Sequence, residues 1–293
     1  MKKFCKIMGI ISAVLAVAGI IFIIIGVKSG GADVIAGRVA NNELPFIHFD
    51  IDDFDTEGME SLSDENTFTK DEVQSIELKG KYGKYQFCQG TNDNLSVSVT
   101  NGSSKVKYSL ENGILKIIDN GNKKFWSTEK TCQIKIYIPT DYKLNNVNIK
   151  VGAGIVGGSY ISNGTLDIDV GAGKGNFDSI MADNYNISIG AGEAEINSSR
   201  LGNGNIEVGM GDFDFTGTIS GNTDIQCGMG DVSLELQNHY SDFNYVLNVG
   251  AGDIEINDED YSGISYSKNI NNSAAFNMNI DCGMGNVSVE NIE

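Results

Sequence analysis

Three aspartates that follow Gly-x-Gly tripeptides have the clearest potential for chemistry in this chain. They are Asp212, Asp231 and Asp253, and an earlier copy of the tripeptide is followed by Glu193. Equivalent side chains of stacked strands lie about 4.8 Å apart, so like charges at these places repel one another. Oxygen ligation by Ca²⁺ would relieve the repulsion, whereas solvation at an exposed edge would make a metal unnecessary. A Ca²⁺ site is therefore one of two open interpretations, and we expect no other cofactor.

Other candidate chemistries find little support in the sequence. The two histidines, His48 and His239, are far apart and lack the spacing of metal ligands. Gly-x-Gly cradles phosphate when a helix follows it, and none of these copies precedes a helical pattern. A lyase-type site needs a basic residue among clustered acids, and Arg200 is the only arginine of the repeats, without an acidic ladder around it. We therefore predict that the chain is not an enzyme and has no catalytic residue.

The charge of the chain narrows the class of partner. Its 293 residues include 21 Lys and Arg against 39 Asp and Glu, and the net charge is −18. Residues 1–30 hold four of the lysines and no acid, which leaves 17 basic against 39 acidic residues in the remainder. Such a surface repels phosphate backbones, so we expect no nucleic-acid partner. Solubility explains the charge, and binding of divalent cations or of a basic polymer is the alternative.

An uncharged segment near the N-terminus predicts a membrane anchor. Residues 7–27 read IMGIISAVLAVAGIIFIIIGV, long enough to cross the hydrocarbon core of a bilayer as one helix. Lys2, Lys3 and Lys6 precede it, which by the positive-inside rule places the N-terminus in the cytoplasm. A cleaved signal peptide is the alternative, although its apolar core is usually shorter. We expect a single-pass protein of the cell membrane with the bulk of the chain outside the cell.

The cysteines predict at most one disulfide. Cys227 and Cys282 each precede Gly-Met-Gly, which predicts small buried core residues. The coil of Val249 lies between them and is expected to separate them by about 9.6 Å. This separation exceeds the reach of a disulfide, about 7 Å between Cα atoms. Cys88 with Cys132 is the remaining candidate pair, and the sequence leaves its pairing open.

A sequence repeat of fixed length predicts the architecture that contains these residues. The tripeptide Gly-(Ala/Met)-Gly recurs five times with a spacing of 19 residues and then twice more at wider spacing. Its first glycines are Gly152, Gly171, Gly190, Gly209, Gly228, Gly250 and Gly283. Such a period indicates stacked supersecondary units.

Two apolar columns precede the tripeptide and predict a strand with one buried face. The first column, three places before the glycine, contains Ile149, Ile168, Ile187, Ile206, Ile225, Leu247 and Ile280. The second, one place before it, contains Val151, Val170, Ile189, Val208, Cys227, Val249 and Cys282. Polar residues lie between the two columns, as in a strand that lines a core.

The apolar alternation slips by one place at Gly-x-Gly, which predicts a corner. Glycine there would adopt unusual backbone angles or allow neighbouring coils to approach. A second turn is predicted at residues 163–164, 183–184, 202–204 and 221–222, where Asn, Asp and Gly gather. The two wider spacings predict loops around residues 239–242 and 261–275.

The end of the chain predicts an open strand edge. The last strand, residues 287–289, comes shortly before the C-terminus and has no evident cap. We expect an oligomer to be able to form through this C-terminal edge of the solenoid, unless the charges of Glu290 and Glu293 block it.

These patterns predict an all-β parallel β-solenoid (β-helix) with coils of about 19 residues, preceded by one transmembrane helix. The expected domains are a basic tip with the transmembrane helix at 1–30, an acidic tether at 31–72, and the solenoid ectodomain at 73–293. Regular repeats begin at about residue 147.

The run IKIYIP at 134–139, the segment LNNVNIKVGAG at 144–154, and the strand-Gly-x-Gly-acid coils that follow resemble a bacterial family of candidate adhesins of unknown function. The sequence is also similar to the adhesin-head (GIN) domain. The likeness covers residues 73–293 and implies a right-handed β-helix on the cell surface, with no catalytic residues to carry over. Family members often accompany envelope-stress or transport genes.

Two functions are therefore expected as alternatives. The first is a non-enzymatic, membrane-anchored adhesive or scaffold module of the cell surface, whose partner is an envelope polymer or a protein. The second is an accessory component of cell-envelope stress signalling that contacts a membrane partner.

Overall fold

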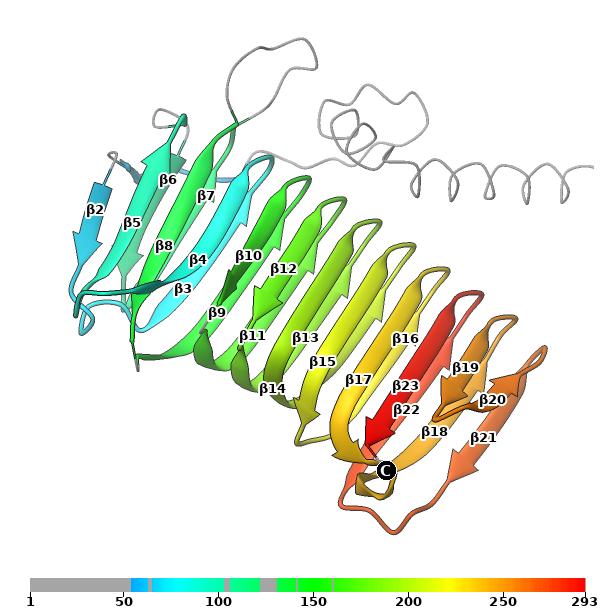
Figure 1. The fold of residues 1–293 in the computed structure, drawn as a ribbon. Helices are drawn as coiled ribbons and strands as arrows, with labels where there is room; N and C mark the ends of the chain where they lie inside the picture. The colour runs from blue at the N-terminus through cyan, green and yellow to red at the C-terminus, as the bar shows by residue number, and fades with distance from the viewer. Residues whose placement is uncertain are drawn as a thin grey trace, which may run out of the picture.

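The computed structural model describes residues 54–292, except for 63–64, 103–105, 122–130, 141 and 160. Strands of the described residues lie in two layers, joined along the stack by Gly-x-Gly corners on one side and by short turns on the other (Figure 1). The one helical element among the described residues is the short 3-10 helix η2 (Tyr240–Asp242). The expectation of an all-β fold is confirmed for this part of the chain.

Hydrogen-bonded neighbours define the order of strands in each layer. Layer 1 contains β1 (Glu60–Ser61), β6 (Val106–Glu111), β7 (Ile114–Asp119), β3 (Ser75–Gly80), β9 (Lys143–Val151), β11 (Ser162–Val170), β13 (Met181–Ile189), the second half of β14 (Glu193–Val208), β16 (Thr223–Cys227), β22 (Phe276–Cys282), β18 (Phe243–Val249) and β21 (Tyr266–Ile270). Layer 2 contains β2 (Glu65–Phe68), β5 (Leu95–Thr100), β8 (Gln133–Pro139), β4 (Lys84–Gly90), β10 (Ile155–Ser159), β12 (Lys174–Asp178), the first half of β14, β15 (Asp212–Ile219), β17 (Asp231–His239), β23 (Asn286–Ile292), β19 (Asp253–Ile256) and β20 (Glu259–Ser262).

Parallel pairing at a register of 19 residues builds the centre of the stack. Ile168 of β11 pairs with Ile149 of β9 on one side and with Ile187 of β13 on the other. Every residue of the two predicted apolar columns is buried, with at most 3% of its surface exposed. Each such side chain contributes roughly 1.5–3 kcal/mol through removal of apolar surface from water. The sequence-predicted faces of the coils are therefore confirmed.

Close approach, not backbone angle, requires glycine at the corners. Among the described residues, glycines with φ between +20° and +160° are Gly58, Gly113, Gly217 and Gly263, none of which lies in a Gly-x-Gly tripeptide. A Cβ atom added to Gly228 would lie 2.7 Å from the carbonyl oxygen of Gly209 in the previous coil. That carbonyl accepts a hydrogen bond from the backbone of Met229 at 2.8 Å, so the ladder continues around the corner.

The second turn of the coil lies elsewhere than predicted. Residues 163–164, 183–184 and 202–204 are inside strands β11, β13 and β14, and only 221–222 falls between strands. In two coils the chain changes direction earlier, at Ser179 and Ser198, which have positive φ values. The polar side chain of Asn163 is buried and donates to the carbonyl of Thr165, so it satisfies the backbone of a strand.

The coils do not stack in chain order at the C-terminal end. Strands β22 and β23, the last of the chain, lie between β16/β17 on one side and β18/β19 on the other (Figure 1). The expectation that the coil of Val249 separates Cys227 from Cys282 is therefore wrong, because these two cysteines are direct register partners. The spacing before Gly283 is wide because the chain first forms the outer coil of β18 and β19, with strands β20 and β21 beyond it. Only then does it form β22 and β23, which lie between that outer coil and the coil of β16 and β17.

The N-terminal end has the same arrangement. Strands β3 and β4 lie between β9/β10 and the later strands β7/β8. Antiparallel strands β6 and β5 continue the two layers, and β1 and β2 pair with them at the margin. Part of the segment expected to be a tether thus lies in the folded unit, with Leu62 and Phe68 in its core.

The predicted open edge is not at the last strand. Strand β23 is paired on both sides, by β17 and by β19, so Glu290 does not guard an edge. The strands at this end of the stack are β21 and β20, which pair antiparallel with β18 and β19. They occupy residues 261–262 and 266–270 of the segment for which a loop at 261–275 was expected, while η2 occupies most of the predicted loop at 239–242. Glu293 lies outside the described residues.

The predicted membrane anchor at residues 7–27 also lies outside the described residues. Within 54–292 and its described parts, no helix has the length and apolar character needed to cross a bilayer.

Candidate functional site

A hollow crossed by polar side chains lies on the outer face of layer 1, near the C-terminal end of the stack. Its volume is about 580 Å³, within the range of small-molecule sites. One row of side chains crosses it, with Glu207, Gln226, Asp281, Asn248 and Ser267 as successive register partners. We call this site the C-terminal hollow.

Hydrogen bonds order part of the row. Asn248 donates from Nδ2 to Oδ1 of Asp281 at 2.7 Å, and Ser267 donates from Oγ to Oδ1 of Asn248 at 3.0 Å. Tyr266 lines the hollow as well, from the edge strand β21. The hollow therefore offers two carboxylates, two amides, hydroxyls and one aromatic ring, a set that suits hydroxyl-bearing and amine-bearing ligands.

The out-of-order coil creates the hollow. Asp281 belongs to β22, and only the insertion of β22 places its carboxylate between the amides of Gln226 and Asn248. The antiparallel strand β21 then extends the row with Ser267. Sequence reasoning missed this site because its row follows the spatial order of the coils.

A second, smaller hollow of about 310 Å³ lies on the same outer face, towards the N-terminal end. Lys150 and Asp169 line it and form an ion pair with 2.9 Å between Nζ and Oδ2. The acids of the C-terminal hollow, Glu207 and Asp281, face no lysine in their row. The outer face of layer 1 thus changes from balanced charge to negative charge along the stack.

In the column of polar side chains next to this row, on the same face of layer 1, side-chain amides form hydrogen bonds from coil to coil. Asn186 donates to Asp167 at 2.6 Å, and Asn205 donates to Asn186 at 3.0 Å. Further along, Asn279 donates to Asp224 at 2.5 Å. These side chains bond to their equivalents in the next coil, which fixes the polar face beside the hollow.

The three aspartates proposed to bind Ca²⁺ lie in one column of layer 2, but not as direct neighbours. Asp212 and Asp231 are register partners, whereas Asn286 separates Asp231 from Asp253. Asn286 donates from Nδ2 to Asp231 at 2.7 Å, which places an amide between two of the expected ligands. At the other end of the column, Glu193 pairs with Lys174 at 2.9 Å. Calcium binding here stays a prediction.

Like charges crowd the outer face of layer 2 around Asp214. Burial raises the pKa of this carboxyl, and the charges of Asp212, Glu195, Glu193 and Glu235 raise it further. Because the folded-state pKa exceeds that of the unfolded chain, ionised Asp214 opposes folding at neutral pH. The associated stability is present at low pH and is lost as the pH rises through the folded pKa.

We therefore expect Asp214→Asn to stabilise the protein at pH 7 by roughly 0.2–1 kcal/mol, because it removes repulsion between cross-strand carboxylates. The gain should disappear below the carboxyl pKa values, where Asp214 is neutral in both states. Denaturant unfolding at pH 7 and pH 3 measures the effect. Asp169→Asn is the matched control and should give no gain, because Asp169 pairs with Lys150. Equal gains from both variants would contradict the local origin of the repulsion.

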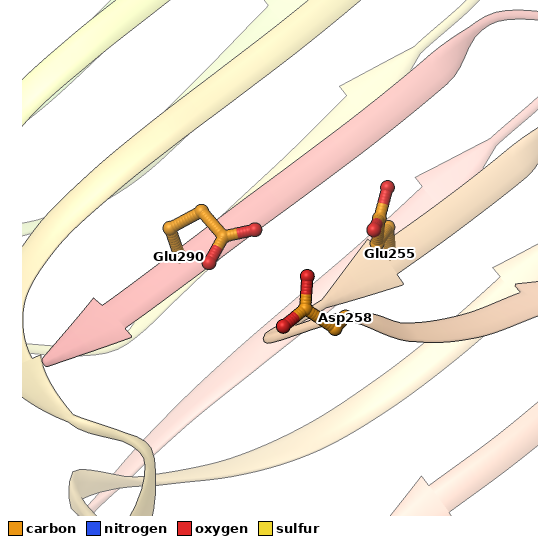
Figure 2. A group of neighbouring side chains, drawn as sticks. All are labelled: Glu255, Asp258 and Glu290. Atoms are coloured by element: carbon orange, nitrogen blue, oxygen red, sulfur yellow. The ribbon is translucent and has the colours of Figure 1, made fainter. Parts of the chain in front are cut away.

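Three carboxylates gather in layer 2 near the end of the chain. The side chains point toward one another and belong to Glu255 of β19, Asp258 of the turn after β19, and Glu290 of β23 (Figure 2). One ligand atom of each lies within 4.8 Å of the others, and all three residues are exposed. Among the described residues, this is the group of three potential metal ligands that lie this close together. The sequence does not reveal it, because β23 belongs to the inserted coil and pairs with β19 out of chain order.

The remaining candidates of the sequence do not form a site. Cys132 directly precedes the Gln133–Lys84 register pair, whereas Cys88 pairs with Tyr137, which is five residues beyond Cys132, about 16 Å at strand spacing. Both are free thiols, and the pairing left open by the sequence does not occur. His239 and Arg200 are exposed strand residues, and His48 lies outside the described residues.

The two layers of stacked coils define an all-β domain of the toastrack type. The family model Toastrack DUF4097 matches residues 62–290, and the chain belongs to this family. A comparison with curated protein sequences gave no match.

Several solved structures are similar to the chain. A candidate adhesin from Parabacteroides merdae has 16% identity and a TM-score of 0.41, with 78% of this chain and 95% of that chain covered. A candidate adhesin from Bacteroides fragilis has 18% identity and a TM-score of 0.36, with 78% and 96% covered. A candidate lipid-binding protein from Parabacteroides distasonis has 17% identity and a TM-score of 0.39, with 83% and 100% covered. The expected relation to the GIN domain stays a prediction.

Proposed function

We propose that this chain is a non-enzymatic adhesive module of the cell surface that binds an amine-bearing envelope polysaccharide through the C-terminal hollow. In this proposal the coils form a right-handed solenoid on the membrane anchor of residues 7–27, with the hollow outside the cell. The observation that carries the proposal is the row of Glu207, Gln226, Asp281, Asn248 and Ser267 across one open hollow.

The chemistry of the row favours a polymer of amino sugars. Carboxylates bind ammonium groups through charge-assisted hydrogen bonds, and amides and hydroxyls bind sugar hydroxyls. Neighbouring strands are about 4.8 Å apart, which is close to the length of one sugar unit, so an extended chain can meet one coil after another. The net charge of −18 attracts a cationic polymer at long range.

The test uses the full chain in detergent micelles and a six-unit glucosamine oligomer as the probe. Titration calorimetry should show binding that Glu207→Gln and Asp281→Asn each weaken about tenfold or more, since a hydrogen bond to a charged group contributes about 1.5–3 kcal/mol. Asp231→Asn is the matched control, because it removes the same charge from the outer face of layer 2. The N-acetylated oligomer should bind more weakly, because it lacks the ammonium groups.

Several outcomes contradict the proposal. If the glucosamine oligomer does not bind, amino-sugar polymers are excluded as ligands. If Asp231→Asn loses as much affinity as the variants of the hollow, the binding depends only on net charge. Equal affinity for the N-acetylated oligomer removes the role of the amine. A labelled oligomer added to intact cells that produce the protein tests location, because binding that requires cell lysis places the hollow inside.

A further inference from the structure

Two buried cysteines lie side by side beneath the C-terminal hollow. Cys227 ends strand β16, Cys282 ends the inserted strand β22, and the two are register partners in parallel strands. Their exposed fractions are 3% and 2%. Neighbouring strands are about 4.8 Å apart, which lies inside the range of 4.4–6.8 Å found between the Cα atoms of disulfide-bonded cysteines.

We propose that Cys227 and Cys282 form a disulfide that locks the inserted C-terminal coil to the regular stack. The bond would join two segments that are 55 residues apart in the chain, and it would hold β22 in the place where it completes the hollow. The inference does not depend on the proposed ligand.

The surroundings permit the two thiols to turn toward each other. In the reduced protein Cys227 donates to the carbonyl of Gly230 and Cys282 donates to the carbonyl of Gly285, each at 3.0 Å. Both carbonyls also accept a backbone N–H from the next coil at 3.1 Å, from Asn286 and Asp253 respectively. Loss of the weak S–H donors therefore leaves neither oxygen unsatisfied.

One of the thiols is suited to begin the reaction. When the Cys227 thiol turns from the Gly230 carbonyl to the Cys282 sulfur, its S–H lowers the pKa of Cys282. The backbone N–H groups of Asp253 and Gly285 support the same direction, against burial and the charge of Asp253. Thiolates are the attacking species in disulfide exchange. Because both residues are buried, exchange requires local opening of the corner.

The oxidant in this proposal is a low-molecular-weight disulfide such as oxidised glutathione. The Cys282 thiolate attacks one glutathione sulfur, which forms a mixed disulfide and releases one glutathione thiolate. After Cys227 loses its proton, its thiolate attacks Cys282 Sγ, which forms the Cys227–Cys282 bond and releases the second glutathione thiolate. Two protein thiols are thus oxidised and one glutathione disulfide is reduced to two thiols.

The test uses the full chain in detergent with Cys5→Ser, Cys88→Ser and Cys132→Ala, so that Cys227 and Cys282 are the remaining cysteines of the five. The protein is equilibrated with oxidised and reduced glutathione in urea below the unfolding midpoint, so that the corner can open. It is then quenched in acid, unfolded and treated with N-ethylmaleimide. In excess oxidised glutathione, intact mass should show that about nine-tenths of the chains add no maleimide and carry no glutathione.

A matched control places the two thiols in the same column of register partners, but at twice the separation. Val208, Cys227 and Cys282 are successive register partners, so Val208→Cys with Cys227→Ser leaves two thiols about 9.6 Å apart. This variant should gain glutathione or maleimide and form no internal bond. Addition of two maleimides, or glutathione adducts without a cross-link, in the Cys227/Cys282 protein overturns the proposal.

A second measurement needs no variant, in case the substituted chain does not fold. The unmodified full chain is oxidised in the same way and digested without reduction. A peptide pair joined through residues 227 and 282 supports the proposal, and recovery of both peptides unlinked under these conditions contradicts it.

Discussion

Gly230→Val should destabilise the protein by about 3 kcal/mol or more, because it forces a side chain into a contact between two backbones. A Cβ atom at this corner would lie against the carbonyl oxygen of Gly211, well inside van der Waals distance, and 2.9 Å from Cγ1 of Val208. The Gly211 carbonyl cannot retreat freely, since it accepts the backbone N–H of Asp231 at 3.1 Å. The two coils must therefore separate and lose ladder hydrogen bonds.

Denaturant unfolding of the full chain, followed by circular dichroism, measures this loss. Met229→Val is the matched control, because it introduces the same side chain one residue earlier at an exposed position. Its effect should stay within about 0.5 kcal/mol, as is usual for surface substitutions. A Gly230→Val protein as stable as the control would mean that the corners do not stack as closely as described.

Ile280→Ala should cost about 2–5 kcal/mol, because it opens a cavity in the inserted coil. Ile280 is fully buried, and its register partners are Ile225 on one side and Leu247 on the other. Neither partner could collapse into the cavity without breaking the column in its own coil. Unfolding free energies of the wild-type and variant full chains measure the effect.

A double-mutant cycle tests the order of the coils directly. Ile225→Ala and Ile280→Ala should couple by about 0.5 kcal/mol or more, because the side chains are neighbours. Ile225→Ala and Leu247→Ala should be additive within about 0.5 kcal/mol, since the inserted coil lies between them. The reverse result would indicate stacking in chain order, and valine variants replace alanine where the double variant unfolds.

Much of the fold could be predicted because the same local pattern is repeated. Apolar columns such as Ile168 with Val170 alternate with polar residues, which fixes the buried face of each strand. The constant spacing fixes the parallel register, as the pairing of Ile168 with Ile149 confirms. The corner at Gly-x-Gly was also predicted, although its glycines are needed for close approach and not for positive φ.

The candidate site could be predicted only in part. The column of Asp212 and Asp231 follows directly from the repeat, but Asn286 separates Asp253 from it. The C-terminal hollow, the carboxylates of Figure 2 and the Cys227–Cys282 neighbours all depend on the inserted coil. No local motif marks any of these three features.

The sequence by itself determined which side chains of a coil face the core, how many residues separate neighbouring coils, and that the surface is acidic. Only the tertiary structure decided which coil lies beside which. The physical reason is that β16, β18 and β22 present the same pair of apolar columns, so local burial is equally satisfied in either order. The choice between these orders rests on contacts between segments far apart in the chain, including the antiparallel strands β20 and β21 that cover the end of the stack.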